Sequence, residues 1–315
     1  MDAKKIVIIG TGGTIAGNAK SDQELVNYAA GEKKAAELLC GLPVPASLSI
    51  ETIELCQIDS KDMSFSILRA LAACVDAQLQ RDDVDGVVIT HGTDTLEESA
   101  VFLEWTLHFN KPVVLTAAMR PSTAISADGP LNLLDSLQVA AYGNAGLWAV
   151  VNNTIYVGHE IVKSHTLKVD GFCADNGGAM GHILNGKVEF YRNVKVDDKM
   201  KLNLEALPTQ DDDYPWVEII YSDVSANPRM LTSLLEANVD GLIVVGTGNG
   251  TVHKNLLPTL MNASCPVVLT TRVRAGKVVN DQYGLLHAPY GHPAKARIWL
   301  ILQLLAHGAG CDNSL

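Results

Sequence analysis

The sequence has no uninterrupted apolar run of about 18 residues, the length that a membrane-spanning helix needs. It is also poor in positive charge, since 24 Lys and Arg residues stand against 35 Asp and Glu residues, a formal net charge of -11. Such a field repels phosphate backbones and anionic lipid surfaces. We therefore expect neither a nucleic acid nor a membrane as a partner.

Cysteine and histidine lack the spacing of metal sites and disulfide frameworks. The 6 cysteines are scattered without CxxC spacing, and the 9 histidines form neither HxH nor HExxH. We therefore expect no metal ion and no disulfide, which fits a cytoplasmic protein, with a periplasmic mature form as the alternative. The apolar stretch within MDAKKIVIIGTGGT is too short for a signal sequence and predicts a buried first strand.

Apolar residues are abundant, at 47% of 315, and form short β-rich runs that alternate with helical patterns. This alternation is typical of a parallel sheet with helices on both faces. We predict an α/β protein with a larger N-terminal, mostly parallel-sheet sandwich domain of flavodoxin-like type and a smaller C-terminal α/β domain. Strands are expected at Lys4–Ile9, Ser49–Leu55, Gly86–Thr90, Pro112–Thr116, Leu147–Val151, Val217–Tyr221, Gly241–Val245 and Pro266–Thr270.

Apolar residues at helical spacing separate these strands. The stretch from Lys195 to Asp213 is the most polar in the chain and predicts an interdomain linker. We expect a catalytic N-terminal domain over residues 1–193, a linker over 194–213 and a C-terminal domain over 214–315. Helices are expected at Ser64–Gln80, Thr95–Leu107, Leu131–Tyr142, Arg229–Ala237, Leu256–Met261 and Ala294–Ala306.

A glycine-rich turn, GTGGTIAG, follows the first expected strand. A dinucleotide fingerprint would need glycine where Ile15 stands, and no Lys-Ser/Thr pair follows to make a P-loop. The turn instead presents the hydroxyls of Thr11 and Thr14 among backbone N–H groups. A hydroxyl beside preorganised amides suits acyl transfer, and an ordinary strand-to-helix turn is an equal alternative for this motif alone.

A second motif, THGTDTLEE, follows the third expected strand. Thr95 and Glu98 have the spacing of a capping box at a helix start. Thr93 and Asp94 precede that cap, at the same edge of the sheet as the first motif. A carboxylate there can hold a substrate ammonium, and a hydroxyl can hold water or relay a proton. His91 is interpreted as a packed loop residue.

Three further features are weaker when taken singly. Arg120 and Asp128, in the loop after the fourth expected strand, are expected to pair or to cap backbone groups. Lys163 is expected to be a solvated surface residue unless it partners Thr93 and Asp94. A second glycine turn, GTGNG, places Asn249 where it can reach a site across a domain or subunit boundary.

Together these motifs resemble the bacterial-type L-asparaginase family, from Ile6 to about Arg297. Both threonine signatures of that family are present in its order and spacing, as TGGTIAG and THGTDT. Further matches are SKDM from Ser60, MRPS from Met119, SADGP from Ser126, GNG from Gly248, and Lys163.

The resemblance implies an amidohydrolase that converts L-asparagine, and in some members L-glutamine, to the acid and ammonia through a threonine acyl-enzyme without metal or cofactor. It implies a homotetramer built from intimate dimers. Thr14 would be the nucleophile and Tyr28 its base, Ser60 would bind the α-carboxylate, Asp94 the α-amino group, and Asn249 would come from a neighbouring subunit. The implied catalytic residues are Thr14, Tyr28, Thr93, Asp94 and Lys163, and the implied substrate-binding residues are Ser60, Lys61, Thr93, Asp94, Asn249 and Asp281.

Two positions depart from the family. Lys61 stands where Gln or Glu commonly contacts the substrate's α-amino group, and a lysine there repels an ammonium. The chain also has no Glu after Glu236, although exported members supply a Glu from the partner subunit. Asp281 is the favoured replacement, and hydrogen bonds from Asn249 and Tyr283 are the neutral alternative.

Two other function classes compete with amide hydrolysis. A non-catalytic amino-acid-binding protein of the same fold would bind ligand without releasing ammonia. A nicotinamide-dependent oxidoreductase would need an acid at the end of the second strand, where Glu54 and Asp59 lie. The broken glycine fingerprint disfavours the oxidoreductase.

Overall fold

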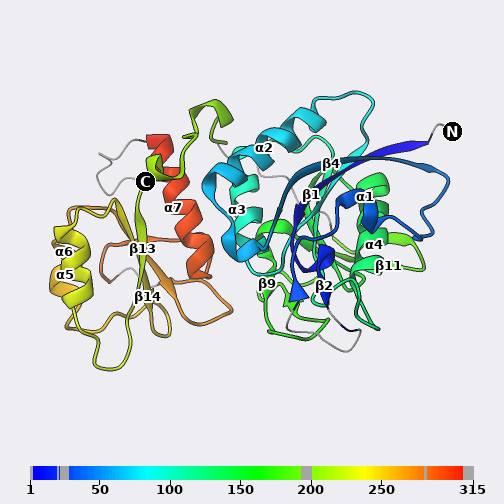
Figure 1. Ribbon diagram of the computed structural model, residues 1–315. Coiled ribbons are helices and arrows are strands. Elements are labelled where there is room, and N and C mark those ends of the chain that lie inside the picture. Colours follow the sequence, from blue (N-terminus) through cyan, green and yellow to red (C-terminus); the bar gives the residue numbers. More distant parts are fainter. Residues whose placement is uncertain (1–2, 20, 22–27, 193–200, 280–281, 308–315) are drawn as a thin grey trace. The chain divides into compact units, whose positions relative to one another are not determined.

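The computed structural model describes residues 3–19, 21, 28–192, 201–279 and 282–307. The chain divides into two compact units, Met1–Leu204 and Glu205–Leu315 (Figure 1). Within the described ranges, the helices are all too short or too polar to cross a membrane.

The first unit is built on an eight-stranded sheet. Its order is β12-β11-β8-β7-β6-β5-β1-β4. The five neighbouring strands β4, β1, β5, β6 and β7 run parallel. The strands β8, β11 and β12 extend the sheet with antiparallel pairs. The strands are β1 (Lys4–Gly12), β4 (Leu48–Ile58), β5 (Gly86–Thr90), β6 (Pro112–Thr116), β7 (Gly146–Val151), β8 (Thr154–Val157), β11 (Gly181–Leu184) and β12 (Lys187–Phe190).

The parallel strands follow the flavodoxin-like order, in which the second strand of the chain lies outside the first and the later strands follow on the other side. The chain therefore changes direction across the sheet between β1 and β5. Ligands bind at such a switch point, outside the carboxyl ends of the strands. The predicted α/β fold is confirmed, and the predicted bounds of β5 and β6 match the structure.

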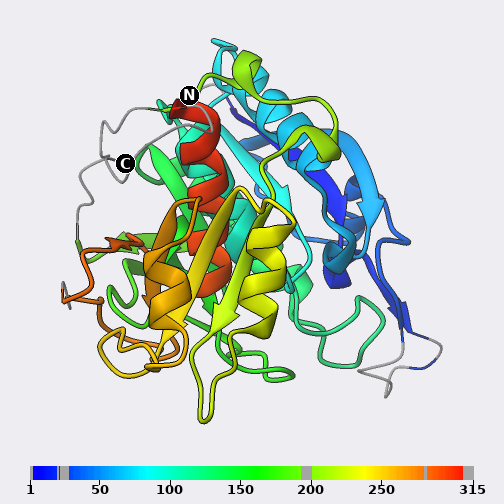
Figure 2. The same cartoon turned by 90° about the vertical axis from the view of Figure 1, so that its left-hand side faces the viewer.

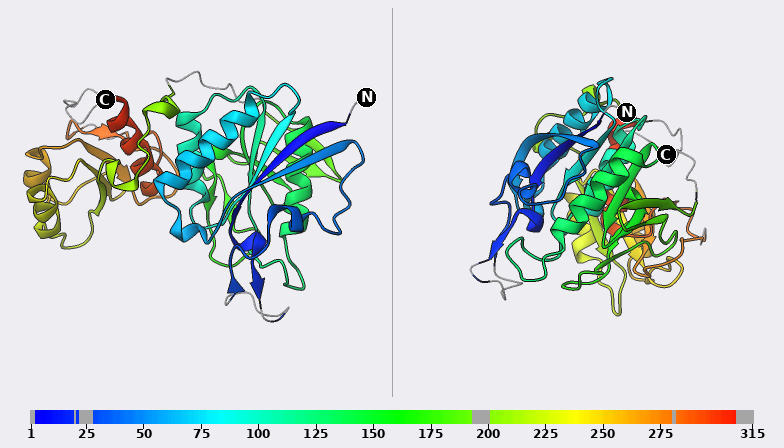
Figure 3. Two further views of the ribbon diagram at one scale, coloured as in Figure 1. Left: turned by 45° about the horizontal axis from the view of Figure 1, so that its top comes forward. Right: turned by 90° about the vertical axis from the view of Figure 1, so that its right-hand side faces the viewer.

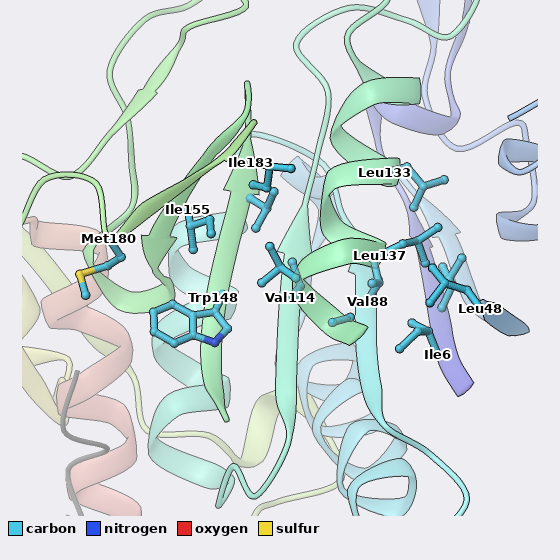
Figure 4. Packing of buried hydrophobic residues seen from close by; sticks show 14 of the residues in the cluster. Ile6, Leu48, Val88, Val114, Leu133, Leu137, Trp148, Ile155, Met180 and Ile183 are labelled. Atoms are coloured by element: carbon cyan, nitrogen blue, oxygen red, sulfur yellow. The ribbon is translucent and has the colours of Figure 1, made fainter. Parts of the chain in front are cut away.

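Helices cover both faces of this sheet (Figures 1 and 3). On one side α2 (Phe65–Leu79) packs with α3 (Leu96–Thr106), and on the other lie α1 (Ala35–Leu38) and α4 (Gly129–Tyr142). Leu133 and Leu137 of α4 pack onto Ile6, Val88 and Val114 of three neighbouring strands (Figure 4).

The strands are apolar along their whole length because both faces are covered. Val7 and Ile9 point away from the α4 side and are as fully buried as Ile6 and Ile8. Each such side chain contributes roughly 1.5–3 kcal/mol by leaving water. This packing fixes the strand ends from which the polar loops emerge.

The second unit has a four-stranded parallel sheet in chain order, β13 (Val217–Tyr221), β14 (Gly241–Gly246), β15 (Val267–Thr271) and β16 (Leu286–His287). Its faces are covered by α5 (Arg229–Glu236) with α6 (Leu257–Met261), and by α7 (Pro293–His307) (Figure 2). The remaining short elements are β2 (Asn18–Ala19), β3 (Tyr28–Ala29), β9 (Val162–Lys163), β10 (Phe172–Cys173) and the 3-10 turns Thr14–Ala16, Ser60–Asp62, Gly158–Glu160, Leu204–Ala206 and Asp211–Asp213.

Candidate active site

The two threonine-containing turns touch at the switch point between β1 and β5. Gly10 of β1 pairs in register with Thr90, the last residue of β5, and β1 continues for two residues to Gly12. Gly13 has φ of 78°, and a Cβ there would lie 2.4 Å from Gly92 Cα. Only glycine permits this backbone conformation and this approach, so the glycines of both motifs bring the turns together.

Thr14 begins the 3-10 turn that follows β1, and its side chain is buried. The backbone before it is fixed, because Gly13 N–H donates to Ile58 O at 2.8 Å and Gly31 N–H donates to Gly13 O at 3.0 Å. The other hydroxyl of the motif, on Thr11, donates to Thr90 O at 3.0 Å and so ties β1 to β5. Thr11 therefore has a structural task, and Thr14 is the candidate nucleophile of the two.

Lys163 is brought to the second motif by a short hairpin in which it pairs with Phe172. Its Nζ donates hydrogen bonds to Thr93 Oγ1 at 2.8 Å and to Asp94 Oδ1 at 2.5 Å. The lysine side chain is 21% exposed and that of Asp94 is 52% exposed, whereas Thr93 is buried. A cation, a hydroxyl and a carboxylate thus form one cluster that is open to solvent through Asp94.

Ser60 joins this cluster from the turn after β4 and is only 2% exposed. Its Oγ accepts the backbone N–H of Asp94 at 3.2 Å, and its carbonyl accepts the hydroxyl of Thr95 at 2.8 Å. The predicted capping box at Thr95 is wrong: Thr95 is the N-cap of α3, but its side chain makes no capping hydrogen bond. The Thr95 hydroxyl is instead observed as a donor to the Ser60 carbonyl.

Lys61 pairs with two acidic neighbours in the sequence, Asp59 and Asp62. Its Nζ lies 3.0 Å from Asp59 Oδ2 and 2.9 Å from Asp62 Oδ2, and the side chain is 61% exposed. Hydrogen bonds to Asp62 and Asp59 raise the pKa of Lys61. Its charge is therefore balanced locally by two carboxylates.

His91 is fully buried behind the second motif. Nδ1 lies 2.8 Å from Gly92 O and Nε2 lies 2.9 Å from Ser99 Oγ. Burial lowers the pKa of His91, so the neutral imidazole is favoured. Both ring nitrogens have hydrogen-bond partners within the protein, which agrees with the interpretation of His91 as a packed loop residue.

The loop after β6 anchors the segment beyond Thr14. Asp128 accepts the backbone N–H groups of Met119 at 2.8 Å and Arg120 at 3.0 Å, which shapes this loop. Ser122 then donates to Gly17 O twice, from its N–H at 3.0 Å and from Oγ at 2.8 Å. Ser122 belongs to the MRPS match, and only the folded loop shows that it reaches Gly17.

For the other predicted site residues, the described part of the chain shows no hydrogen bond to the cluster of Thr93, Asp94 and Lys163. Tyr28 contributes its backbone to β3, opposite Ala19, while its side chain lies outside the described residues, as does all of Asp281. Asn249 belongs to the second unit, where its Oδ1 accepts the N–H of Val279 at 2.9 Å. Tyr283 lies in the same unit and its Oη accepts the N–H of Val252 at 3.2 Å.

Glu54, one of the acids that a nicotinamide-dinucleotide site would need, makes a structural hydrogen bond. Glu54 Oε2 accepts the N–H of Ala35 at 2.8 Å, at the start of α1, and its Oε1 lies 2.9 Å from the position of a Cβ on Gly10. The carboxylate therefore fills the space over the glycine turn. In the described part of the chain, no three His, Cys, Asp or Glu side chains gather to hold a metal ion.

Comparisons with known proteins agree with this geometry. Residues 5–196 match the family described as asparaginase, N-terminal, and residues 216–312 match the glutaminase/asparaginase C-terminal domain. The chain is 35% identical to L-asparaginase 2 of Escherichia coli K12, over 95% of this chain and 88% of the relative. It is 34% identical to the glutaminase-asparaginase of Acinetobacter glutaminasificans, over 95% and 94%.

A solved structure gives the same result. A probable cytoplasmic L-asparaginase from Campylobacter jejuni superposes with a TM-score of 0.88 and 36% identity, covering 97% of this chain and 96% of that one. The family predicted from the two threonine motifs is confirmed, and the oxidoreductase reading finds no support. This chain belongs to the bacterial-type L-asparaginase family.

Proposed function

We propose that this protein is an L-asparaginase, an amidohydrolase that converts L-asparagine to L-aspartate and ammonia through an acyl-enzyme on Thr14. The observation that carries this proposal is the cluster of Lys163, Thr93 and Asp94 beside the turn that holds Thr14. Membership of the asparaginase family supports the reaction class. The chemistry needs no metal ion or cofactor.

In the first half of the reaction, the Thr14 hydroxyl attacks the side-chain carboxamide carbon of the substrate. A threonine hydroxyl is a poor nucleophile at neutral pH and needs a base, for which we propose Tyr28. The C–N bond then breaks, and ammonia leaves with the transferred proton. In the second half, water attacks the ester, releases L-aspartate and restores the Thr14 hydroxyl.

Thr93 is suited to hold the water or the leaving group. Because Lys163 Nζ donates to Thr93 Oγ1, the Thr93 hydroxyl keeps its own proton for donation. Lys163 is also held by Asp94, so the orientation of all three groups is set before substrate binds. Such preorganisation is what electrostatic stabilisation of a transition state requires.

The ends of the substrate are assigned to Ser60 and Asp94. Ser60 Oγ already accepts the Asp94 N–H, which leaves the Ser60 hydroxyl proton to donate to the substrate's α-carboxylate. The exposed Asp94 carboxylate receives the α-ammonium. Lys61, neighbouring Ser60, contributes little repulsion because Asp59 and Asp62 balance its charge.

The active oligomer is proposed to be a homotetramer of intimate dimers, with Asn249 and Asp281 reaching the site of a neighbouring subunit. Asn249 Oδ1 accepts a hydrogen bond within its own unit. Its Nδ2 group is therefore proposed as the donor toward the site of the neighbouring subunit. Asp281→Ala is expected to raise KM without dissociating the oligomer, as light scattering after size exclusion would show. Unchanged kinetics would place the contact elsewhere, and a fully active monomer would remove it.

A cytoplasmic location is proposed on the cysteines. Within the described residues, Cys40, Cys56, Cys74 and Cys265 are free thiols. Secreted proteins more often pair such residues. Fractionation of the native host would test the location, and recovery in the periplasm would contradict it.

The proposed activity is tested by ammonia release. Purified protein is incubated with L-asparagine and, in parallel, with L-glutamine, and ammonia is followed in a coupled assay. Stoichiometric ammonia and L-aspartate are expected. Binding of asparagine in calorimetry without ammonia release would identify the non-catalytic amino-acid-binding protein instead.

A further inference from the structure

Thr95 connects the helix after β5 to the turn after β4. Its Oγ1 donates a hydrogen bond of 2.8 Å to the carbonyl oxygen of Ser60, 35 positions earlier. In the opposite direction, the N–H of Asp94 donates to Ser60 Oγ at 3.2 Å. Two consecutive residues therefore hold Ser60 at both its carbonyl and its hydroxyl.

The Thr95 hydroxyl makes this contact and makes no capping hydrogen bond in its own helix. A threonine at an N-cap normally uses its hydroxyl to accept a backbone N–H of the first helical turn. Thr95 occupies the N-cap of α3 without making that bond. Helix capping therefore does not account for a hydroxyl at this position, and the bond to Ser60 does.

Ser60 has little room to move. A Cβ on Gly92 would lie 2.3 Å from Ser60 Oγ and 2.6 Å from Ser60 Cβ, so the serine side chain packs directly on the glycine backbone. Gly92 in turn contacts the turn that leads to Thr14. A shift of the Ser60 carbonyl would move its hydroxyl relative to Asp94, the two groups proposed to bind opposite ends of the substrate.

We propose that Thr95 is a positioning residue for substrate binding, which acts by fixing Ser60 where its hydroxyl meets the substrate's α-carboxylate. This inference rests on the proposed function of the site. Thr95 itself touches no reacting atom. Its loss should therefore weaken substrate binding more than it slows the chemical step, because the carboxamide end of the substrate is held by other residues.

The test compares Thr95→Val with Thr95→Ser. Thr95→Val keeps the β-branched shape and removes the hydroxyl, and Thr95→Ser keeps the hydroxyl. We expect Thr95→Val to raise KM for L-asparagine by about 10-fold, with kcat within about 3-fold of wild type. A displaced Ser60 would lose its hydrogen bond to the substrate's charged α-carboxylate, and the loss of such a bond has this scale. Thr95→Ser should restore KM to within about 2-fold.

Thr106→Val is the matched control. Thr106 is a buried threonine of the same helix whose hydroxyl donates to the Phe102 carbonyl at 2.8 Å, away from Ser60. Its kinetics should equal wild type. Thr95→Ala is measured beside Thr95→Val, and the split between KM and kcat is taken from whichever variant melts close to wild type.

A double-mutant cycle tests the route through Ser60. Ser60→Ala removes the hydroxyl that Thr95 is proposed to place, so adding Thr95→Val to Ser60→Ala should change KM by less than about 2-fold. Multiplication of the two single effects would overturn the inference, as would an unchanged KM in Thr95→Val. Absence of ammonia release by the wild type would instead overturn the proposed function, and this inference with it.

Discussion

Lys163 Nζ lies 2.8 Å from Thr93 Oγ1, although 70 positions separate the two residues. Lys163 lies in β9, a two-residue strand in a separate two-stranded sheet, where it pairs with Phe172 of β10. The same ammonium lies 2.5 Å from Asp94 Oδ1. One side chain thus links a buried hydroxyl to a solvent-facing carboxylate, and the three are expected to act as one unit.

Lys163→Met and Asp94→Asn test this unit. Each substitution alone should lower kcat by about 100-fold or more, because each releases the same hydrogen-bonded cluster. The double variant should lose less than about 10-fold further. Lys168→Met, on an exposed lysine of the same hairpin, is the control and should leave kcat unchanged. Losses that multiply would show that the two residues act separately.

Thr14→Val tests the nucleophile. The substitution keeps the β-branched shape in a buried position, so the protein should fold and melt as wild type, while kcat falls by at least about 1,000-fold. The control is Thr11→Val, which removes a hydroxyl that already serves Thr90 O and should retain most of the turnover. Near-normal turnover in folded Thr14→Val would remove the assignment.

Substrate choice follows from the length of the side chain that reaches Thr14. Glutamine is one methylene longer than asparagine, and one methylene is worth roughly 1–3 kcal/mol in a fitted site, so kcat/KM should favour asparagine by about 10- to 200-fold. Equal values for both amides would indicate a glutaminase-asparaginase. Competition between the two amides in one mixture, with L-aspartate and L-glutamate quantified separately, gives the ratio directly.

Lys61→Gln tests whether the lysine faces the substrate. Because Asp59 and Asp62 balance its charge at 3.0 and 2.9 Å, the variant should show KM for asparagine within about 2-fold of wild type. A clear fall in KM would mean that Lys61 turns toward the substrate's ammonium when the site is occupied.

Asp135 gives a prediction about stability. It is 4% exposed on α4, and burial raises its pKa to about 6 in spite of a hydrogen bond from Asn153. The raised pKa favours the protonated carboxyl in the folded state. The contribution of Asp135 to the free energy of unfolding is therefore fully present below about pH 4 and is lost as pH rises through 6. Asp135→Asn should therefore stabilise the protein by roughly 1–3 kcal/mol at pH 8 and leave stability unchanged near pH 4.

Urea unfolding at the two pH values measures this difference. Asp212→Asn, on an exposed carboxylate, is the control and should show no such gain. An Asp135→Asn protein that is less stable than wild type at pH 8 would mean that the Asn153 contact requires the charged carboxylate.

The sequence by itself determined the elements and the positions of the two threonine motifs. Strands such as β5 and β6 are continuous apolar runs, because both of their faces are buried, and such runs are visible without the fold. The loops that follow them must emerge at the carboxyl edge of a parallel sheet. The family followed from the same local sequences.

Only the tertiary structure decided which side chains meet. The two-residue strands β9 and β10 carry no periodic signal, yet they place Lys163 on Thr93. Spacing alone predicted that Thr95 caps its own helix by accepting a backbone N–H, whereas its hydroxyl donates to the carbonyl of Ser60 in a distant turn. Local patterns record burial, which is set strand by strand, whereas hydrogen-bond partners are set by sheet order and register, which juxtapose residues remote in the chain.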